Sequence, residues 1–503
     1  DVSDALDNTS IGYLAGDAHT TGYSNVAIGR QALSENTTGS ENVALGDRTL
    51  DAATTVNRNT AIGFEALTDN TTGASNVAIG AKALANNTTA SNNTSVGTGS
   101  LEINTTGANN AAFGQGALYA NTTASENTGI GYQALAANTT GNNNTSVGSQ
   151  ALDGNTTGDE NTAVGAYALG DQTTGSYNTA VGRQALKYNT TASNNTAIGR
   201  HALQVNTTGS SNVAIGMNAL DANTTASNNV AIGQDAMGAN TTGANSVAIG
   251  FNALRDHTTT NDNVAIGYFS MRYNTTGYQN TAVGKGSLQA NTTGALNTAI
   301  GDQALEANTT ADNNTGVGHK SLNQNTTGTQ NTAVGNYAGY SITTGNNLTA
   351  LGYNAAYTNT GGENTAIGAE ALEKNTTGDS NTAVGFRAME TNTTGTSNTA
   401  VGRDALEANT TGAGHVAVGR DSLANNTTGN YNTAVGQNAL IANTTGGYNA
   451  SVGKDALSTA TTADSNTAVG YRASYLSTIG NNNTALGRET LYTNVAADRN
   501  VAI

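Results

Sequence analysis

The stretch that decides the fold is Asn25–Glu41, which reads NVAIGRQALSENTTGSE. The next seventeen residues, Asn42–Arg58, restate it without a gap as NVALGDRTLDAATTVNR. A fixed short period of this kind is typical of solenoids and fibres rather than of a row of separate globular domains. The seventeen-residue copy, counted with Asn25 at position one, is therefore the unit from which the chain is built.

Copies begin at Asn8 and recur every seventeen residues, apart from one copy at 348–363 that is a residue short. There are twenty-nine copies in all. We predict four parts: a partial or atypical leading segment 1–7, regular copies at 8–347, the shortened irregular copy, and regular copies at 364–503 that end within a copy. Because the chain starts with Asp rather than Met and stops inside a copy, we expect it to be a segment of a longer protein.

The composition of the 503 residues excludes several classes of protein. There is no Cys, so the chain has neither a disulfide framework nor a thiolate metal site. There is also no Pro, which would remove a backbone N–H from any hydrogen-bonded ladder, and this absence indicates ladders along the whole chain. The formal net charge of −16 argues against nucleic acid and anionic membranes as partners, and no apolar run is long enough to span a membrane.

Positions two to five of the copy read V/T-A-V/I-G, an alternating strand pattern. Position four is Val, Ile or Leu in nearly every copy, so we predict that positions two and four face the core. Position nine, Leu or Met almost throughout, is predicted as the second core anchor, for example Leu33 and Leu186. The Gly at position five, such as Gly29, indicates a corner with positive φ or close backbone approach, and N-T-T-G/A at positions twelve to fifteen indicates another turn.

A helical repeat is the main alternative to this interpretation. Each copy contains about seven Asn, Thr and Gly residues, which are poor helix formers, and the known helical repeats are longer. We therefore predict an all-β fold, a parallel β-solenoid (β-roll) of seventeen-residue coils with two or three short strands each. Twenty-nine coils stacked in register at roughly 4.8 Å would form an elongated rod about 140 Å long, with the charged residues at its solvent-exposed corners.

Asn recurs at positions one and twelve of the copy. Identical Asn side chains stacked coil on coil can hydrogen-bond to one another as ladders, and we predict this structural role for both positions. The alternative is glycosylation, because N-T-T is an acceptor sequence in most copies. Examples are Asn36, Asn70, Asn121 and Asn138. Sites one coil apart are too close for all of them to carry a glycan.

Position three is nearly always Ala, as at Ala27, Ala163 and Ala180, with only Ser or Gly in its place elsewhere. If position four faces the core, this column of Ala lies on the outside of the coil. A long, flat stripe of methyl groups is an expected interface, and the simplest partner is the same stripe on another copy of the chain. We therefore predict self-association through the position-three Ala residues.

The copies resemble two families of fibrous proteins. The segments NVAIG at Asn25, Asn76 and Asn212 and SVAIG at Ser246 resemble the repeated head motif of trimeric autotransporter adhesins. The longer form NTAVGxxALxxNTTGxxNTAVG is similar to repeats in predicted tail-fibre proteins of phages, and this resemblance covers essentially the whole chain. It implies a left-handed β-roll assembled as a homotrimer, although the seventeen-residue period is longer than the coil usual in adhesin heads. The motif is specific for architecture rather than for function.

Three copies depart from the pattern in the same way, because position nine shrinks to Gly339, Ala356 and Ser474. In each of them position ten is Tyr. The copy that contains Gly339 and the short copy that follows it form one irregular zone. It is interpreted as a tolerated variant of the repeat, and the alternative is a bend or a docking point.

Nothing in the sequence indicates catalysis. The five His residues fall in copies far apart, so no triad or metal cluster can be assembled from them. They are His19, His201, His257, His319 and His415. The glycine-rich Asp repeats of calcium-binding β-rolls and the P-loop Lys of nucleotide sites are absent from the sequence. We therefore expect no enzyme activity, no catalytic residues, no cofactor and no metal.

Three classes of function remain. The preferred one is the structural shaft of an extracellular, cell-surface or virion fibre that projects a binding tip, with the chain itself as partner. The second is adhesion along the rod to a host-surface glycan or receptor through Tyr side chains, which is favoured if they gather on one side. Examples are Tyr13, Tyr23, Tyr119, Tyr177, Tyr278 and Tyr431. The third is ice binding by the Thr residues at positions thirteen and fourteen, which is disfavoured because adjacent residues in a turn point in different directions.

Overall fold

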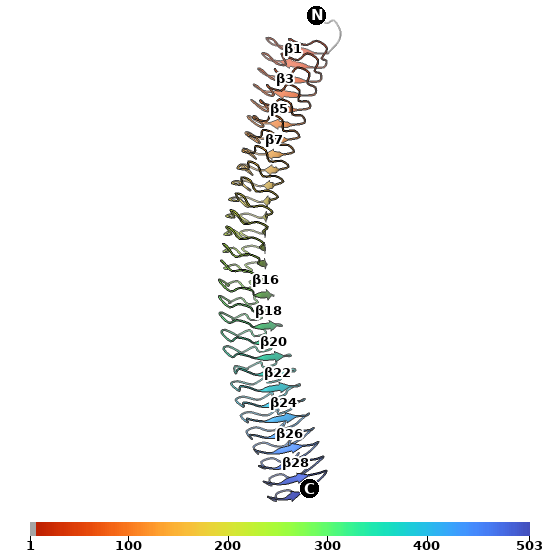
Figure 1. Ribbon diagram of the computed structural model, residues 1–503, viewed down its shortest axis with the longest axis vertical. Helices are drawn as coiled ribbons and strands as arrows, with labels where there is room; N and C mark the ends of the chain where they lie inside the picture. Colours follow the sequence, from red (N-terminus) through yellow and green to blue (C-terminus); the bar gives the residue numbers. More distant parts are fainter. Residues whose placement is uncertain (1–6) are drawn as a thin grey trace. The chain divides into compact units, whose positions relative to one another are not determined.

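A computed structural model describes residues 7–503 of the chain, so the predicted leading segment 1–7 lies outside the described residues except for Asp7. The chain divides into two compact units, Asp1–Ile249 and Gly250–Ile503. Both are all-β, and residues 7–503 contain no helix. Each unit is a parallel β-solenoid, as the sequence predicts (Figure 1).

Each unit contributes fifteen strands. Those of the first unit are β1 (Thr9–Ile11), β2 (Val26–Ile28), β3 (Val43–Leu45), β4 (Thr60–Ile62), β5 (Val77–Ile79), β6 (Thr94–Val96), β7 (Ala111–Phe113), β8 (Thr128–Ile130), β9 (Thr145–Val147), β10 (Thr162–Val164), β11 (Thr179–Val181), β12 (Thr196–Ile198), β13 (Val213–Ile215), β14 (Val230–Ile232) and β15 (Val247–Ile249). Those of the second unit are β16 (Val264–Ile266), β17 (Thr281–Val283), β18 (Thr298–Ile300), β19 (Thr315–Val317), β20 (Thr332–Val334), β21 (Thr349–Leu351), β22 (Thr365–Ile367), β23 (Thr382–Val384), β24 (Thr399–Val401), β25 (Val416–Val418), β26 (Thr433–Val435), β27 (Ala450–Val452), β28 (Thr467–Val469), β29 (Thr484–Leu486) and β30 (Val501–Ala502).

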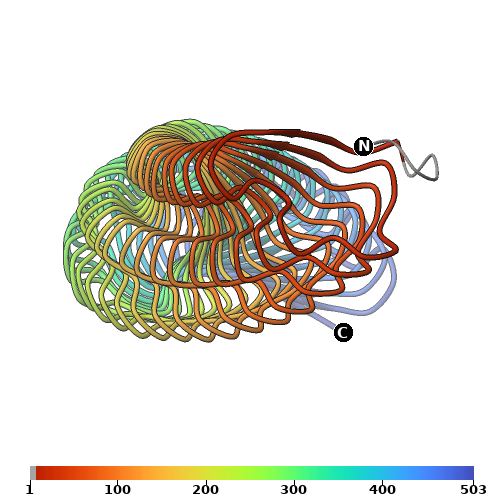
Figure 2. The same ribbon diagram turned by 90° about the horizontal axis from the view of Figure 1, so that it is seen from above.

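Successive strands within a unit pair in parallel and in register. Strand β11 pairs with β12 so that Ala180 lies opposite Ala197 and Val181 opposite Ile198. Seen from above, each coil is a single loop that lies over the next one in its unit (Figure 2). Identical repeat positions therefore stack on one another, which confirms the predicted in-register stacking.

Each coil has one strand of three residues, at positions two to four, rather than the two or three strands expected. The backbone explains the difference, because positions seven, nine and seventeen have positive φ, which extended strands do not adopt. In one coil these positions are Gln184 at 58°, Leu186 at 53° and Asn194 at 62°. The rest of the coil is consequently a series of turns.

The turns are nevertheless hydrogen-bonded from coil to coil. The Leu186 N–H donates to the carbonyl of Ala202 in the following coil at 2.9 Å, and the Gln184 N–H donates to Ala166 in the preceding coil at 3.0 Å. Backbone groups outside the strand thus find partners in both directions, which satisfies the polar groups of a narrow molecule. This arrangement accounts for the exclusion of Pro inferred from the composition.

The interior reverses the predicted faces of the strand. Ala163, Ala180 and Ala197 at position three have no exposed surface, whereas Val181 and Ile198 at position four are 37% and 38% exposed. The prediction that positions two and four face the core is therefore wrong, and so is the prediction of an outward Ala stripe that joins chains. The Leu or Met at position nine is fully buried, as predicted, except at Leu491 in the last complete copy, which is partly exposed.

The small size of position three has a steric cause inside the coil. A Cβ added at Gly129 would lie 3.3 Å from Cγ of Leu118 and 3.1 Å from the carbonyl oxygen of Ala134. Only Gly, Ala or Ser fits against this wall. Where Ser146 occupies the position, its hydroxyl donates to the carbonyl of Ala151 at 2.6 Å, so the buried polar group is satisfied.

Both reasons predicted for the Gly at position five, a positive φ and close backbone approach, are confirmed. Gly182 has φ of 136°, in a region that side chains disfavour. A Cβ at the same residue would lie 2.5 Å from the carbonyl oxygen of Gly199 in the next coil. Position five therefore allows successive coils to approach closely.

The short copy 348–363 keeps the stacking intact. Strands β21 and β22 pair with Thr349 opposite Thr365, a step of sixteen residues. In the regular coil that follows, the side chain of Asn375 donates to the carbonyl three residues further on, whereas Asn359 donates two residues further on, to Gly361 at 2.8 Å. The turn is thus one residue shorter while the strand column is unchanged.

Candidate functional site

The Asn residues at position twelve form a buried ladder. The Nδ2 group of Asn121 donates to Oδ1 of Asn104 at 2.8 Å, and that of Asn138 donates to Oδ1 of Asn121 at 3.0 Å. Each Nδ2 also donates to a carbonyl of its own turn, as Asn121 does to Ala124 at 2.9 Å. The structural role predicted for this position is confirmed.

Position one carries a second ladder of a different kind. The backbone N–H of Asn178 donates to Oδ1 of Asn161 in the preceding coil at 3.0 Å, and its own Nδ2 donates to the carbonyl of Ala192 at 2.8 Å. The side chain thereby joins the strand to the turn beside it. Both Asn columns are buried. The four Asn residues named above as possible glycosylation sites have no exposed surface in the folded chain. These are Asn36, Asn70, Asn121 and Asn138.

Two of the His residues replace Asn within these ladders. His257 stands at position twelve and His415 at position one, and burial lowers the pKa of each to about 4. The Nδ1 atom of His415 accepts a hydrogen bond from the backbone N–H of Asn432 at 3.2 Å, so the ring takes over the acceptor role of the missing amide. The structure therefore gives both residues a place in the framework of the coil.

The His, Asp and Glu side chains of the described residues form no group of three that could hold a metal ion. His319 lies beside a carboxylate, with Nδ1 at 3.5 Å from Asp302, on the outside of its coil. His19 and His201 lie in other coils of the first unit. The structure does not bring the five His residues together.

The strand presents its larger side chains outward. We call positions two and four of the strands, such as Thr179 and Val181 in β11, the outward strand face. No copy has a charged residue at either position. Exposed members at position four include Leu45 at 40% and Phe113 at 41% in the first unit and Leu351 at 45% in the second. Within each unit this face is an apolar column, aliphatic except at Phe113, beside a column of Thr, Val and Ala.

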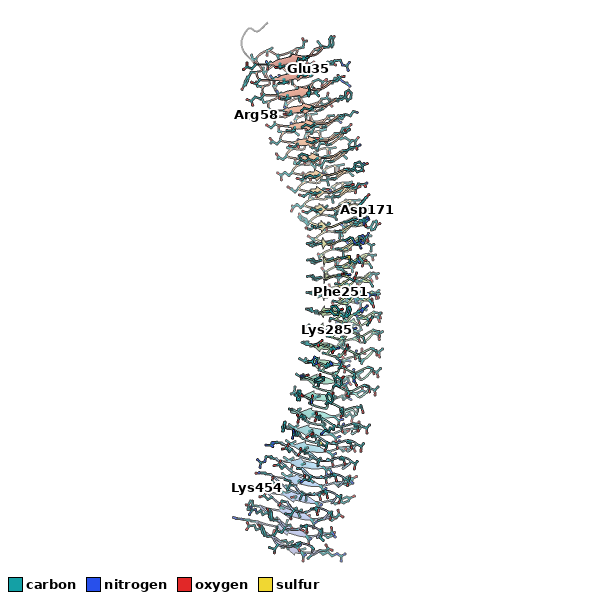
Figure 3. The ribbon with its side chains drawn as sticks, turned by 180° about the vertical axis from the view of Figure 1, so that it is seen from behind. Glu35, Arg58, Asp171, Phe251, Lys285 and Lys454 are labelled. Atoms are coloured by element: carbon teal, nitrogen blue, oxygen red, sulfur yellow. The ribbon has the colours of Figure 1, made fainter. Side chains whose placement is uncertain are left out.

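Charged side chains lie on the other surfaces of the coils, and the labelled residues Glu35, Arg58 and Lys454 point outward in Figure 3. Opposite charges often meet at the same repeat position in successive coils, as Arg58 and Glu41 do at 2.8 Å. Such pairs are exposed, so water and salt screen them and they add little to stability. Asp153 at position ten is partly buried rather than fully exposed, and this burial raises its pKa to about 6.

The Tyr side chains avoid the outward strand face. All of them occupy positions six, seven, ten, eleven, sixteen or seventeen, which belong to two different segments of the coil. The six Tyr residues singled out above are exposed, and they are divided between both segments. This distribution does not favour a continuous Tyr surface along one side.

The irregular zone compensates for its small residue at position nine. A Cβ added at Gly339 would lie 3.0 Å from Cδ2 of Leu348, which occupies position one in place of Asn, and Ile342 at position twelve is also fully buried. Two apolar side chains thus fill the space that Leu leaves. Outside them Tyr340 and Tyr357 stack at 5.1 Å between ring centroids.

The third irregular coil has no such compensation. Ser474 and Ser477, at positions nine and twelve, are buried, and neither hydroxyl has a hydrogen-bond partner among the described residues. Tyr475 stacks on Tyr492 at 5.2 Å. The three coils that look alike in sequence therefore differ in how their interiors are filled.

The Thr residues at position thirteen are used within the solenoid. The hydroxyl of Thr88 donates to the carbonyl of Thr105 at 3.1 Å, and that of Thr122 donates to Thr139 at 3.0 Å. These hydroxyls link one coil to the next. Position thirteen is therefore bonded within the solenoid, whereas Thr at position fourteen, such as Thr89, is exposed.

Comparison with known proteins leaves the architecture as the main guide to function. No protein-family model matches the chain, and no curated protein matches its sequence. Among the described residues there is no helix of sufficient length and apolar character to cross a membrane. The features on which a function can be argued are the buried ladders, the outward strand face and the local surface of the turns.

Proposed function

We propose that this chain is the structural shaft of an extracellular fibre, either a virion tail fibre or a cell-surface filament, that projects a binding tip. The observation that carries the proposal is the bonding of every part of the coil to its neighbours. Strand, turns and two Asn columns all repeat from coil to coil within each unit. Such a stack resists local opening because no long segment is free of hydrogen bonds.

A structural rather than catalytic role agrees with the chemistry of the side chains. The Asn side-chain amides form hydrogen bonds within the ladders. The carboxylates are dispersed over the turns, and the described His residues lie far from one another. The resemblance of the repeat to adhesin heads and predicted phage tail fibres supports an extracellular or virion location and left-handed winding. The net charge of −16 disfavours nucleic acid as a partner.

We further propose that the shaft is a homotrimer whose chains meet through the outward strand face. Only a partner with the same seventeen-residue step can contact every coil, and another copy of this chain has that step. Full burial of a Val, Leu or Ile side chain covers about 60–120 Å² at roughly 25 cal/mol per Å². Threefold symmetry is taken from the adhesin resemblance.

The exposed area is of the right order for a stable interface. Six of the fourteen position-four residues of β2 to β15 are 36–41% exposed and the other eight less, so together they offer at most roughly 350–700 Å². A standard interface buries about 800 Å² per partner, and position two adds to the sum. The first unit thus offers nearly enough apolar surface without help from the second.

Light scattering combined with size exclusion tests this assembly. The unmodified chain should have three times the monomer mass of 50.4 kDa. The triple variant Val164→Glu, Val181→Glu, Ile198→Glu should assemble more weakly, because it places charges at the centre of an apolar interface. The control changes position six of the same coils, in the variant Ala166→Glu, Arg183→Glu, Arg200→Glu, and should assemble normally. A monomer at all concentrations, or equal assembly of both variants, would refute the proposed interface.

A further inference from the structure

Position seven of the coil is Gly in two consecutive copies, at Gly99 and Gly116, and in one isolated copy at Gly286. Every other copy has a side chain there. The backbone does not demand Gly, since Gln133 and Gln150 adopt similar φ values of 50° and 52° at the same position. The two consecutive Gly residues therefore remove two stacked side chains from this surface.

A groove of about 330 Å³ lies over these two Gly residues in the first unit. Gly99 and Gly116 form part of its lining. Two Tyr residues also line it, Tyr119 at position ten and Tyr132 at position six, with exposed fractions of 42% and 48%. Their rings are thus accessible and are held on adjacent coils.

The remaining lining is polar and carries one negative charge. Glu102 lies on one side of the groove, where its carboxylate is 4.0 Å from Nζ of Lys82. Gln115 and Gln133 supply two side-chain amides. Neither amide has a hydrogen-bond partner within residues 7–503, so both are free to bond to a ligand.

We propose that this groove binds a neutral sugar unit of a glycan. A sugar ring has an apolar face of C–H groups, which pack on an aromatic ring, and a rim of hydroxyls, which bond to carboxylates and amides. The groove is at the small end of the range for ligand sites, about 300–1,000 Å³, which suits one or two sugar units. Glu102 and the acidic chain disfavour an anionic sugar.

The site is independent of the proposed assembly. Its side chains come from positions six, seven and ten, and none of them belongs to the outward strand face. The groove is formed by a single chain and does not require the proposed trimer. Gly286 provides an internal comparison, because its neighbours at position seven are Phe269 and Gln303 rather than a second Gly.

Saturation-transfer NMR with the full chain tests the proposal. The probes are cellotetraose, maltotetraose and a β-1,4-galactan tetrasaccharide, with sialyllactose as the anionic comparison. The double variant Gly99→Gln, Gly116→Gln refills the groove with a residue that the coil accepts at this position. A Cβ at Gly116 would lie 3.5 Å from Cγ of Gln133, an ordinary contact, and one at Gly99 would lie 3.1 Å from Oε2 of Glu102, at the end of a flexible side chain that can move, so the variant should fold.

We expect at least one neutral tetrasaccharide to bind and the double variant to bind it at least about tenfold more weakly. Tyr132→Ala should weaken binding as well, and Gly286→Gln should leave it unchanged. Circular dichroism confirms that each variant is folded. Absence of binding by all three neutral probes, binding of sialyllactose alone, or full binding by the double variant would overturn the proposal.

Discussion

At the scale of the residue, position three of the strand shows why the inward face was assigned wrongly. Alternation in V/T-A-V/I-G identifies two faces, but it does not say which of them is inside. The larger aliphatic residues at position four suggested a core, whereas Ala180 is buried and Val181 is 37% exposed. The informative signal was the restriction of position three to Ala, Ser and Gly. A position that holds only small residues in every copy is expected to lie in a confined interior. Position four, in contrast, varies up to Phe113.

Enlarging the buried Ala should damage the coil more than enlarging its exposed neighbour. Ala180→Leu forces a longer side chain against the Leu column and should lower the free energy of unfolding by about 1–3 kcal/mol. Val181→Leu adds one methylene on the surface and should change it by no more than about 0.5 kcal/mol. Urea unfolding, with hydrogen exchange around residues 178–200 as the local readout, measures both. Equal losses for the two variants would contradict the assignment of faces.

At the scale of the coil, the stacking could be predicted but the path between the strands could not. The repeat of Asn at positions one and twelve predicted ladders that the structure contains. The turns at positions six to eleven were missed because positions such as 186 hold Leu, which rarely adopts a φ of 53°. Backbone hydrogen bonds to the neighbouring coils stabilise this conformation. These bonds cannot be predicted from the sequence of a single copy.

The groove at Gly99 and Gly116 was also missed at this scale, although its signal was present. Comparison of position seven across all copies isolates the only two consecutive Gly residues. Tyr119 was named as a possible contact with a glycan, but Tyr132, which lines the same groove, was not. The proximity of positions six, seven and ten on adjacent coils depends on the turn geometry, which the sequence alone does not reveal.

The contribution of the position-twelve Asn ladder to stability can be tested on two adjacent Asn residues. Asn87 is buried and bonds to Asn70 at 2.9 Å, to Ala90 at 3.0 Å and to Asn104 at 2.9 Å. Asn87→Ala leaves these groups unpaired and should lower the free energy of unfolding by roughly 1–3 kcal/mol or more. The exposed Asn86 has no such role, so Asn86→Ala should stay within about 0.5 kcal/mol. Urea unfolding of the two variants compares them directly, and similar values would argue against an energetic role for the ladder.

At the scale of the whole molecule, the period of the sequence is the strongest predictor. It led to parallel stacking in both units, and the short copy 348–363 agrees, because it omits its residue in a turn and keeps β21 and β22 in register. Assembly and function were less predictable, since they depend on which surface stays exposed. With the Ala column inside, the proposed interface moves to the outward strand face.

The central claim is that each seventeen-residue coil is an interchangeable unit held by its register to the next. Deleting residues 195–211 removes one whole coil and places Asn178 beside Asn212 and Leu186 beside Leu220. Deleting only 195–203 removes about half a coil and misaligns every column at that point. Thermal unfolding followed by circular dichroism compares the two with the unmodified chain. The account predicts an unchanged melting midpoint for the whole-coil deletion and a clear loss of stability for the half-coil deletion, whereas similar behaviour of the two deletions would contradict it.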